Sequence, residues 1–300
     1  MKTSVAVRES TGDRIFLTAV YVFLSIILII VAYPLVYVFS SSFSSASAVI
    51  AGKVWLWPVK PTLYGYQAVF RYPEVWTGYL NSLIYTVGAT ILSVALTIMM
   101  AYPLSKKDFY GRRFFVWALL FAMMFSGGLI PFYLLVKSLG LLNTRLSMII
   151  PSALSVFSVI VAKTFFQSTI SEDLYEAAEL DGCSDIGFLL RIVLPLSKPI
   201  IAVLVLWSVV ANWNSYFNAL IFLNSQSLYP LQLVLREVLI LNNVSMSSMT
   251  LSPEQLKMFE DMKTLLQYSL IVVASVPVLF MYPLAQKYFV KGVMIGSVKE

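Results

Sequence analysis

Six long apolar stretches constrain the fold of this chain more than any other feature. They occupy residues 15–39, 80–104, 114–136, 146–168, 199–223 and 264–286, and the only charged residue within them is Lys163. A helix needs about 20 mostly apolar residues to cross the hydrocarbon core of a bilayer. Because backbone polar groups in hydrocarbon must pair with one another, each segment is expected to be helical. The sequence therefore predicts an all-α polytopic membrane protein with six transmembrane helices.

Composition argues against the alternative, in which these stretches are buried helices of a large soluble protein. Charged residues make up 12% of the chain, about half of the roughly 25% usual in soluble domains. The first stretch is longer than the apolar core of a cleavable signal peptide, which has about 7–15 residues, so a retained helix is expected. No internal repeat or low-complexity linker is visible, and residues 1–300 are expected to form a single transmembrane domain.

The distribution of basic residues predicts the orientation of the chain. The short loop after the second stretch contains Lys106, Lys107, Arg112 and Arg113, and short basic loops remain in the cytoplasm. Both termini are then cytoplasmic, and two long loops face outward. The first is rich in Trp and Tyr, which either mark the membrane–water interface or stack against a sugar or its binding protein. The basic residues that give the net charge of +6 lie at the ends of spans. They are therefore interpreted as topology signals, and no nucleic acid is expected as a partner.

The chain lacks the residues that several classes of site require. Cys183 is its only cysteine and it contains no histidine, so neither an internal disulfide nor a Cys/His metal site is expected. The only Gly-Lys pair, Gly52-Lys53, has no glycine five residues earlier and does not make a phosphate-binding loop. We therefore expect no catalytic residue, no metal and no cofactor on this chain.

The source of energy for transport is also constrained. The apolar stretches carry no ionisable residue away from their ends, whereas ion-coupled transporters place such residues near the membrane midplane. A passive pore, or a transporter driven by another subunit, fits this pattern better. A sodium site built from backbone carbonyls stays compatible with it.

Residues 170–198, between the fourth and fifth stretches, form a distinctive polar segment. A helix is expected after Ser171, because serine caps helices and the acidic residues that follow suit the positive end of the helix dipole. Gly182 is expected to end that helix in a left-handed conformation. Ser184 should cap a second helix, which Pro195 and Pro199 should close. The segment is either a helix–turn–helix that docks on another protein or an ordinary amphipathic connector.

The same segment resembles the EAA motif of ABC importer permeases. The matching positions are Glu176, Ala177, Ala178, Asp181, Gly182, Leu194 and Pro195. The resemblance implies the type I ABC importer permease fold in a bacterial cytoplasmic membrane. It also implies that residues 170–198 are a cytoplasmic coupling segment that inserts into a cleft of an ATPase subunit. The two alanines would keep one face of the helix slim enough for close approach.

Other segments are similar to the carbohydrate branch of this family. Asn81-Ser82 and residues 130–133 and 139–144 resemble the maltose-type sugar permeases, whereas residues 213–220 and the C-terminal residues 286–299 resemble the G-type subunit of the maltose permease pair. The Asp181–Asp185 sequence resembles the branch that serves alginate and other polysaccharide-derived oligosaccharides. In the G-type subunit the tail reaches into the ATPase dimer, which implies that role for Gly292, Gly296 and Ser297. A frayed terminus is the alternative.

The resemblance implies a sugar or oligosaccharide as cargo and several partners. These are a second, distinct permease subunit, two cytoplasmic ATPase subunits that hold ATP and Mg, and an extracytoplasmic solute-binding protein, all assembled in membrane lipid. This chain would couple ATP hydrolysis on its partners to inward translocation. The alternatives are an ion-coupled secondary transporter and a passive channel or membrane scaffold, for which the EAA-like segment would have no purpose. Many glycans, and a periplasmic or a lipid-anchored binding protein, fit the sequence equally well.

Polar residues in the fifth stretch are candidates for the translocation pathway. Asn214 and Asn218 are four residues apart and would share one face of a continuous helix, with Tyr216 between them. Amides are costly toward lipid, so the pair should face protein or water. It either bonds packed helices together or lines a sugar cavity, and in the maltose system the partner permease makes most of the sugar contacts.

Overall fold

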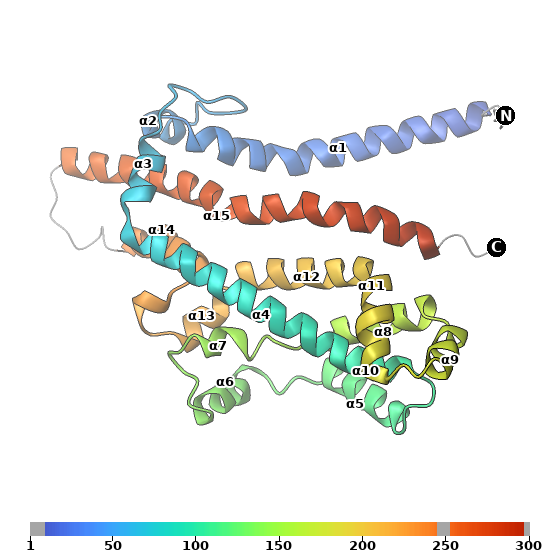
Figure 1. The fold of residues 1–300 in the computed structure, drawn as a ribbon. Helices are drawn as coiled ribbons and strands as arrows, with labels where there is room; N and C mark the ends of the chain where they lie inside the picture. Colours follow the sequence, from blue (N-terminus) through green and yellow to red (C-terminus); the bar gives the residue numbers. More distant parts are fainter. Residues whose placement is uncertain (1–9, 245–252, 297–300) are drawn as a thin grey trace. The chain divides into compact units, whose positions relative to one another are not determined.

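The computed structural model describes residues 10–244 and 253–296, and within these two ranges every regular element is a helix (Figure 1). The predicted all-α class is confirmed. By their contacts, the described residues divide into two compact units. The first comprises residues 10–71 and 253–273, and the second comprises residues 72–244 and 274–296.

The first unit is dominated by one long apolar helix. It contains α1 (Thr11–Ser42), α2 (Ala46–Ile50), α3 (Tyr64–Arg71) and the beginning of α15 (Pro253–Gly296). A reciprocal capping box between Ser10 and Asp13 starts α1. Its apolar side chains are exposed along nearly its whole length, and burial begins only at Ser40. This pattern suits a helix whose solvent is lipid.

Close packing in the first unit depends on small residues. A Cβ atom added to Gly65 of α3 would lie 2.4 Å from the Ser269 Oγ and 2.9 Å from the Leu265 carbonyl oxygen of α15. The Ser269 hydroxyl in turn donates to the Ser42 carbonyl over 3.4 Å. Small residues at helix contacts let backbones approach in the absence of a hydrophobic driving force in lipid.

The second unit contains the remaining elements. They are α4 (Pro73–Ser105), α5 (Arg112–Met124), α6 (Leu129–Ser138), α7 (Leu146–Ile149), α8 (Val156–Thr169), α9 (Glu172–Leu180), α10 (Asp185–Phe188), a π-helix (Leu189–Val193), α11 (Leu194–Leu196), α12 (Lys198–Trp213), α13 (Phe217–Phe222), a 3-10 helix (Gln226–Leu228), α14 (Leu231–Val244) and the end of α15. Helix α4 runs through the unit and packs against α12, α8 and α14 (Figure 1).

Helix α4 is central because one of its faces is lined with small and hydroxyl-bearing residues. The buried positions are Val75, Gly78, Asn81, Ser82, Tyr85, Thr86, Ala89, Thr90, Ser93, Thr97, Ala101 and Leu104. They recur every three or four residues and therefore form one continuous stripe. At the start of this stripe, the Asn81 amide donates to the carbonyls of Ser227 and Tyr229 over 2.8 and 3.2 Å. The Ser82 hydroxyl accepts from the Leu231 amide over 2.8 Å.

Helical structure coincides with all six predicted stretches, but not as six unbroken helices. Three helical segments are by themselves long and apolar enough to span a membrane: Thr11–Ser42, Pro73–Ser105 and Glu260–Met281. Two further spans arise if α5 with α6, bent by 113°, and the 185–196 helices with α12, bent by 81°, each count as one. The single transmembrane domain and the count of six spans stay predictions.

Three of the predicted stretches do not coincide with single helices of the same length. The third stretch is interrupted before Gly128, whose φ of +84° does not fit a helix. In the fourth, α7 ends before Pro151, which lacks an amide hydrogen, and α8 begins only at Val156. The last helix begins at Pro253 and continues to Gly296, well beyond residues 264–286 on both sides.

Candidate functional site

The EAA-like segment, residues 170–198, begins with α9, whose ends follow from local chemistry. Glu172 and Asp173 occupy its first turn, as predicted, and Ser171 stands at the N-cap position. The Ser171 side chain makes no capping hydrogen bond, so that part of the prediction is wrong. Gly182 has a φ of +73°, which confirms the predicted left-handed turn. The Gly182 and Cys183 amides donate to the carbonyls of Glu179 and Ala178, each over 2.9 Å, and together they form a Schellman motif.

The second half of the segment is a chain of short helices. Ser184 caps α10 as predicted, and its hydroxyl accepts from the Gly187 amide over 3.2 Å. From α10 the chain continues through a π-helix into α11, and this helical run ends at Leu196, one residue after Pro195 and close to the predicted end. The wider π turn precedes a proline that cannot donate and would crowd the carbonyl four residues earlier. The chain bends at Ser197, and Pro199 lies in the first turn of α12.

The EAA-like residues are mostly exposed. Glu176, Ala177, Asp181, Gly182 and Pro195 are exposed, and Leu194 is half-buried. Ala178 is the exception, because it is buried in the core of the second unit with Phe188 and Val193. The expectation that both alanines face a partner therefore fails for Ala178, which faces its own chain. The small side chain of Ala178 lets α9 lie close to that core.

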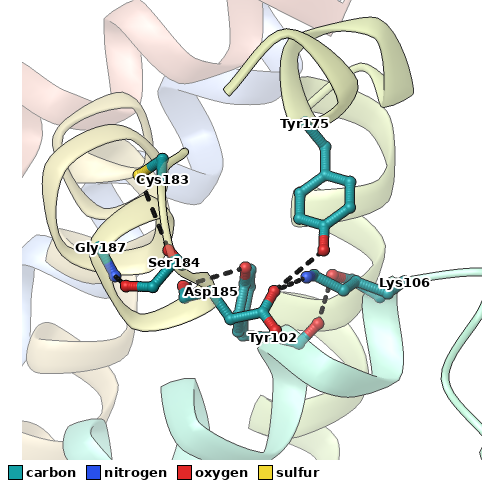
Figure 2. A network of polar contacts seen from close by, with 8 residues as sticks. Tyr102, Lys106, Tyr175, Cys183, Ser184, Asp185 and Gly187 are labelled. Atoms are coloured by element: carbon teal, nitrogen blue, oxygen red, sulfur yellow. Dashed lines mark hydrogen bonds and ion pairs between the residues drawn. The ribbon is translucent and has the colours of Figure 1, made fainter. Parts of the chain in front are cut away.

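A polar cluster joins this segment to the end of α4, and Figure 2 shows how its side chains converge. Lys106 forms an ion pair with Asp185, and the Tyr175 hydroxyl donates to the same carboxylate over 3.1 Å. The Lys106 ammonium also lies 3.7 Å from the centre of the Tyr175 ring, at cation–π distance. The Tyr102 hydroxyl donates to the Asp185 carbonyl over 3.4 Å. We call these four residues the Lys106 cluster.

The charge state of the Lys106 cluster is fixed by its geometry. Burial acts to lower the pKa of Lys106, but hydrogen bonds to Asp185, Tyr175 and Tyr102 outweigh it and hold that pKa above the ordinary 10.5. The hydrogen bond from Lys106 is the main cause that holds the pKa of Asp185 below 3.8. Stabilisation from Asp185 is therefore lost only as pH falls below 3.8, and that from Lys106 only as pH rises above 10.5. The pair stays ionised through the physiological range.

A second set of contacts lies beside the Lys106 cluster. Lys107 forms an ion pair with Glu172 at the start of α9, and the Gln167 amide donates to the Ser105 carbonyl over 3.2 Å. The 105–108 turn, the end of α8 and the start of α9 enclose a cavity of about 180 Å³. The EAA-like segment is thus held by two ion pairs to the residues that directly follow α4.

The predicted pathway residues do not share a helix face. Helix α12 ends at Trp213 and α13 begins at Phe217, so Asn214 and Asn218 are not one helical turn apart. Asn214 ends α12, and its side-chain amide donates back to the Val210 carbonyl over 2.9 Å. Asparagine competes for backbone groups in this way, which favours helix ends. The shared-face prediction is therefore wrong, and Tyr216 precedes α13 with an exposed side chain.

A different polar set lines a cavity of about 400 Å³ between α4, α8 and α12. Its lining is Ser93, Thr97, Ser152, Ser155, Phe157, Ser158, Leu204, Trp207, Ser208, Ala211, Asn212, Ser215 and Asn218. Asn218 is therefore retained as a candidate, while Asn214 and Tyr216 are absent from the lining. Asn212 accepts from the Ser152 hydroxyl over 3.2 Å. None of the lining side chains is ionisable.

Two aromatic rings and one unsatisfied hydroxyl add to the character of this cavity. The Trp207 and Phe157 rings lie 5.5 Å apart, centre to centre. Thr97 is 1% exposed, and its hydroxyl has no hydrogen-bond partner within the described part of the chain. Hydroxyls, amides and an indole face are groups that bind an uncharged polyol by hydrogen bonding and stacking.

The proposed tail contacts are only partly within the described residues. Gly292 and Gly296 belong to the last turns of α15, while Ser297 lies outside the ranges that the structure describes. Their role at an ATPase stays a prediction, as does the coupling role of the EAA-like residues.

Comparison with known proteins places these features in a family context. Residues 93–295 match the family described as "Binding-protein-dependent transport system inner membrane component". The chain is 38% identical to the polygalacturonan/rhamnogalacturonan transport system permease protein YtcP of Bacillus subtilis, over 96% of this chain and 99% of that protein. It is also 38% identical to Protein LplC of the same organism, with 97% of each chain covered.

A solved structure is similar across almost the whole fold. It is a crystal structure of a bacterial ABC transporter involved in the import of the acidic polysaccharide alginate, and one of its chains is 34% identical to this one. The match covers 95% of this chain and 100% of that chain, with a TM-score of 0.83.

Proposed function

Because the chain belongs to the family of binding-protein-dependent transport system inner membrane components, we propose that it is a permease subunit of an ABC importer for an oligosaccharide. It is a multi-pass membrane protein with both termini in the cytoplasm. Two cytoplasmic ATPase subunits, a second and distinct permease, and an extracytoplasmic solute-binding protein complete the assembly. The chain itself breaks no bond in the cargo.

The observation that carries this proposal is the coincidence of full-length similarity with an exposed EAA-like segment. The relative named as a transport system permease matches over 96% of this chain and 99% of its own length. Within the match, Glu176, Asp181 and Gly182 lie exposed in a compact helix–turn–helix. Leu180 and Ile186, on either side of that turn, are 90% and 71% exposed. Exposed apolar side chains flanked by carboxylates suit a docking surface for another protein.

Coupling follows from the way this segment is held. ATP binding closes the two ATPases and draws the docked segments together. The Lys106 cluster and the buried contacts of Ala178 make α9 and α10 move with the ends of α4, α8 and α12. Movement at the ATPase is thereby passed to the helices that surround the uncharged cavity. The cavity supplies one wall of the path along which the released glycan moves inward.

The cargo class follows from the relatives and from the chemistry of the cavity. One relative is named for the transport of polygalacturonan and rhamnogalacturonan. The similar solved structure belongs to a transporter involved in the import of alginate. We propose an oligosaccharide derived from a plant or algal cell-wall polysaccharide. The hydroxyl, amide and indole groups of the cavity match the hydroxyl-rich faces that such sugars share. Carboxylates on the cargo, where present, would be recognised by the other subunits.

Co-purification and ATPase stimulation test the proposal together. The tagged chain, expressed together with the ATPase and second permease of the same organism, should elute with them as one complex. Its ATP hydrolysis in proteoliposomes should rise when liganded binding protein is added. Elution of the chain alone from membranes that contain all the subunits would contradict the proposal and favour a channel or scaffold.

A further inference from the structure

A third cavity, separate from the proposed cargo path, lies at the beginning of α5. It measures about 510 Å³ and is lined by Lys107, Phe109, Gly111, Arg112, Arg113, Val116, Trp117 and Lys163. Four of the eight lining residues are cations, and none is a carboxylate. Lys163 belongs to α8, whereas Arg112 and Arg113 belong to α5, so two different helices contribute cations to the cavity. The predicted topology puts this cavity at the cytoplasmic end of the membrane-spanning helices.

Three of these four cations have no counter-charge among the described residues. Lys107 is paired with Glu172, but Arg112, Arg113 and Lys163 form no ion pair within residues 10–244 and 253–296. Like charges around one cavity repel each other and are retained at a cost to stability. Basic residues at span ends often serve only to orient the chain. An orienting role alone requires neither a shared cavity nor the convergence of Lys163 of α8 with Arg112 and Arg113 of α5.

The helix end at this cavity adds to the positive potential. Helix α5 is preceded by Gly111 in a left-handed conformation, no side chain caps it, and its first turn contains no acidic residue. A helix N-terminus favours negative charge through its free amide groups and its dipole. Here the first turn instead carries Arg112 and Arg113. The helix end and the cation cluster therefore call for the same kind of ligand, an anion.

The surroundings of the cavity distinguish a membrane lipid from a soluble anion. Helix α5 has no buried residue at all. Phe114, Trp117 and Phe121 are 72%, 63% and 63% exposed and follow one another along one helix face. Trp117 belongs both to this face and to the cavity lining. A phosphate held by the cations would thus have an apolar surface directly beside it, on which an acyl chain can lie.

We propose that this cavity binds the phosphate headgroup of an anionic phospholipid of the inner leaflet. Arg112, Arg113 and Lys163 contact the phosphate, and Trp117 contacts the start of an acyl chain. Such a lipid would offset part of the positive charge of the cavity and hold the 105–113 loop, and with it the Lys106 cluster, against α5 and α8. Basic pockets between spanning helices on the cytoplasmic side are suited to acidic headgroups.

Lipid titration tests the proposal on the assembled, delipidated complex. Phosphatidylglycerol is added in a neutral detergent, and bound lipid is counted by native mass spectrometry. Each basic residue near an anionic headgroup strengthens binding about fivefold, so the double variant R112Q/K163Q should bind about 30-fold more weakly. K198Q removes a basic residue of the same predicted face that lies outside the cavity and should bind as the unaltered complex does. Equal binding by R112Q/K163Q would overturn the proposal, as would the absence of phosphatidylglycerol binding to the complex.

Two further measurements do not depend on the folding of the double variant. Millimolar inorganic phosphate should leave the bound lipid in place; its displacement would identify a soluble anion as the natural ligand. Phosphatidylglycerol with brominated acyl chains should quench part of the tryptophan fluorescence of the unaltered complex. The W117F complex should show correspondingly less quenching. Identical quenching of the two proteins would contradict the contact with Trp117.

Discussion

Gly182 is the residue on which the geometry of the coupling segment depends most. Its φ of +73° allows the turn between α9 and α10, and, its chain neighbours apart, no heavy atom of the described residues lies within 4 Å of the position that a Cβ would take. A substitution is therefore penalised by backbone strain and not by a clash. A β-branched residue in this conformation costs about 1–2 kcal/mol, which favours a turn that no longer presents Glu176 and Asp181 correctly.

We predict that Gly182→Val uncouples ATP hydrolysis from cargo, so that liganded binding protein no longer stimulates the ATPase. Glu176→Lys should do the same by reversing the charge at the docking surface. Gly140→Val is a matched control, because Gly140 has a φ of +68° and equally open surroundings in a turn outside the coupling segment. It should lose similar stability but keep stimulation. Normal stimulation of both Gly182→Val and Glu176→Lys would count against the assigned docking role.

The Lys106 cluster makes a second prediction at this scale. The side chain of Lys106 is 17% exposed while that of Asp185 is 64% exposed, so solvent screens part of their attraction. Together with the Tyr175 ring, the interaction is expected to contribute about 1 kcal/mol. Lys106→Met should therefore speed hydrogen exchange of α9 and α10 amides about fivefold, and Asp185→Asn should act in the same direction.

The neighbouring ion pair supplies the control for that measurement. Lys107 and Glu172 have side chains that are 74% and 53% exposed, and exposed pairs contribute little. Lys107→Met should change exchange less than twofold. If Lys106→Met and Lys107→Met have the same small effect, the Lys106 cluster does not hold the segment.

The residues of the Lys106 cluster could not be found from the sequence. Ser184 and Gly182 act through neighbours a few positions away, and their serine and glycine chemistry is visible in any local reading. Lys106 and Asp185 are 79 positions apart, and lysines next to a span are read first as topology signals. Only the packing of α4 beside α10 makes them partners.

At the scale of helices, breaks in the apolar stretches decide which side chains meet. Apolar content predicts a hydrophobic segment but does not reveal where its backbone leaves the helix. The Asn214 side chain bonds to its own helix, and the chain then turns before α13. That turn brings Asn218 into the same cavity lining as Asn212, a pairing that a continuous helix would not give.

A substitution series should separate these asparagines. Asn212→Leu and Asn218→Leu remove amides from the cavity lining and should reduce cargo uptake several-fold, with basal ATPase activity and complex yield unchanged. Asn214→Leu, outside the lining, should have a smaller effect on uptake. If the complex fails to assemble in detergent in Asn212→Leu and Asn218→Leu but assembles in Asn214→Leu, the amides of Asn212 and Asn218 have a structural role. They are then not part of the pathway.

The whole-molecule account makes a prediction for the single cysteine. Cys183 is half-buried and unpaired, directly after Gly182 in the coupling segment. If the segment enters a cleft of the ATPase, a water-soluble maleimide should label Cys183 at least tenfold more slowly in the full complex than in the chain without ATPase. Labelling should also require access from the cytoplasmic side. Equal rates with and without ATPase would place the docking surface elsewhere.

The central claim is that this chain moves an oligosaccharide with energy supplied by partner ATPases. Its most direct test is uptake of a labelled oligosaccharide panel into proteoliposomes that contain the whole complex, with binding protein outside and ATP inside. The account predicts uptake of at least one oligosaccharide that needs both ATP and binding protein, persists when proton and sodium gradients are collapsed, and is abolished by Gly182→Val. Uptake that continues without ATP, or that follows an ion gradient, would contradict it.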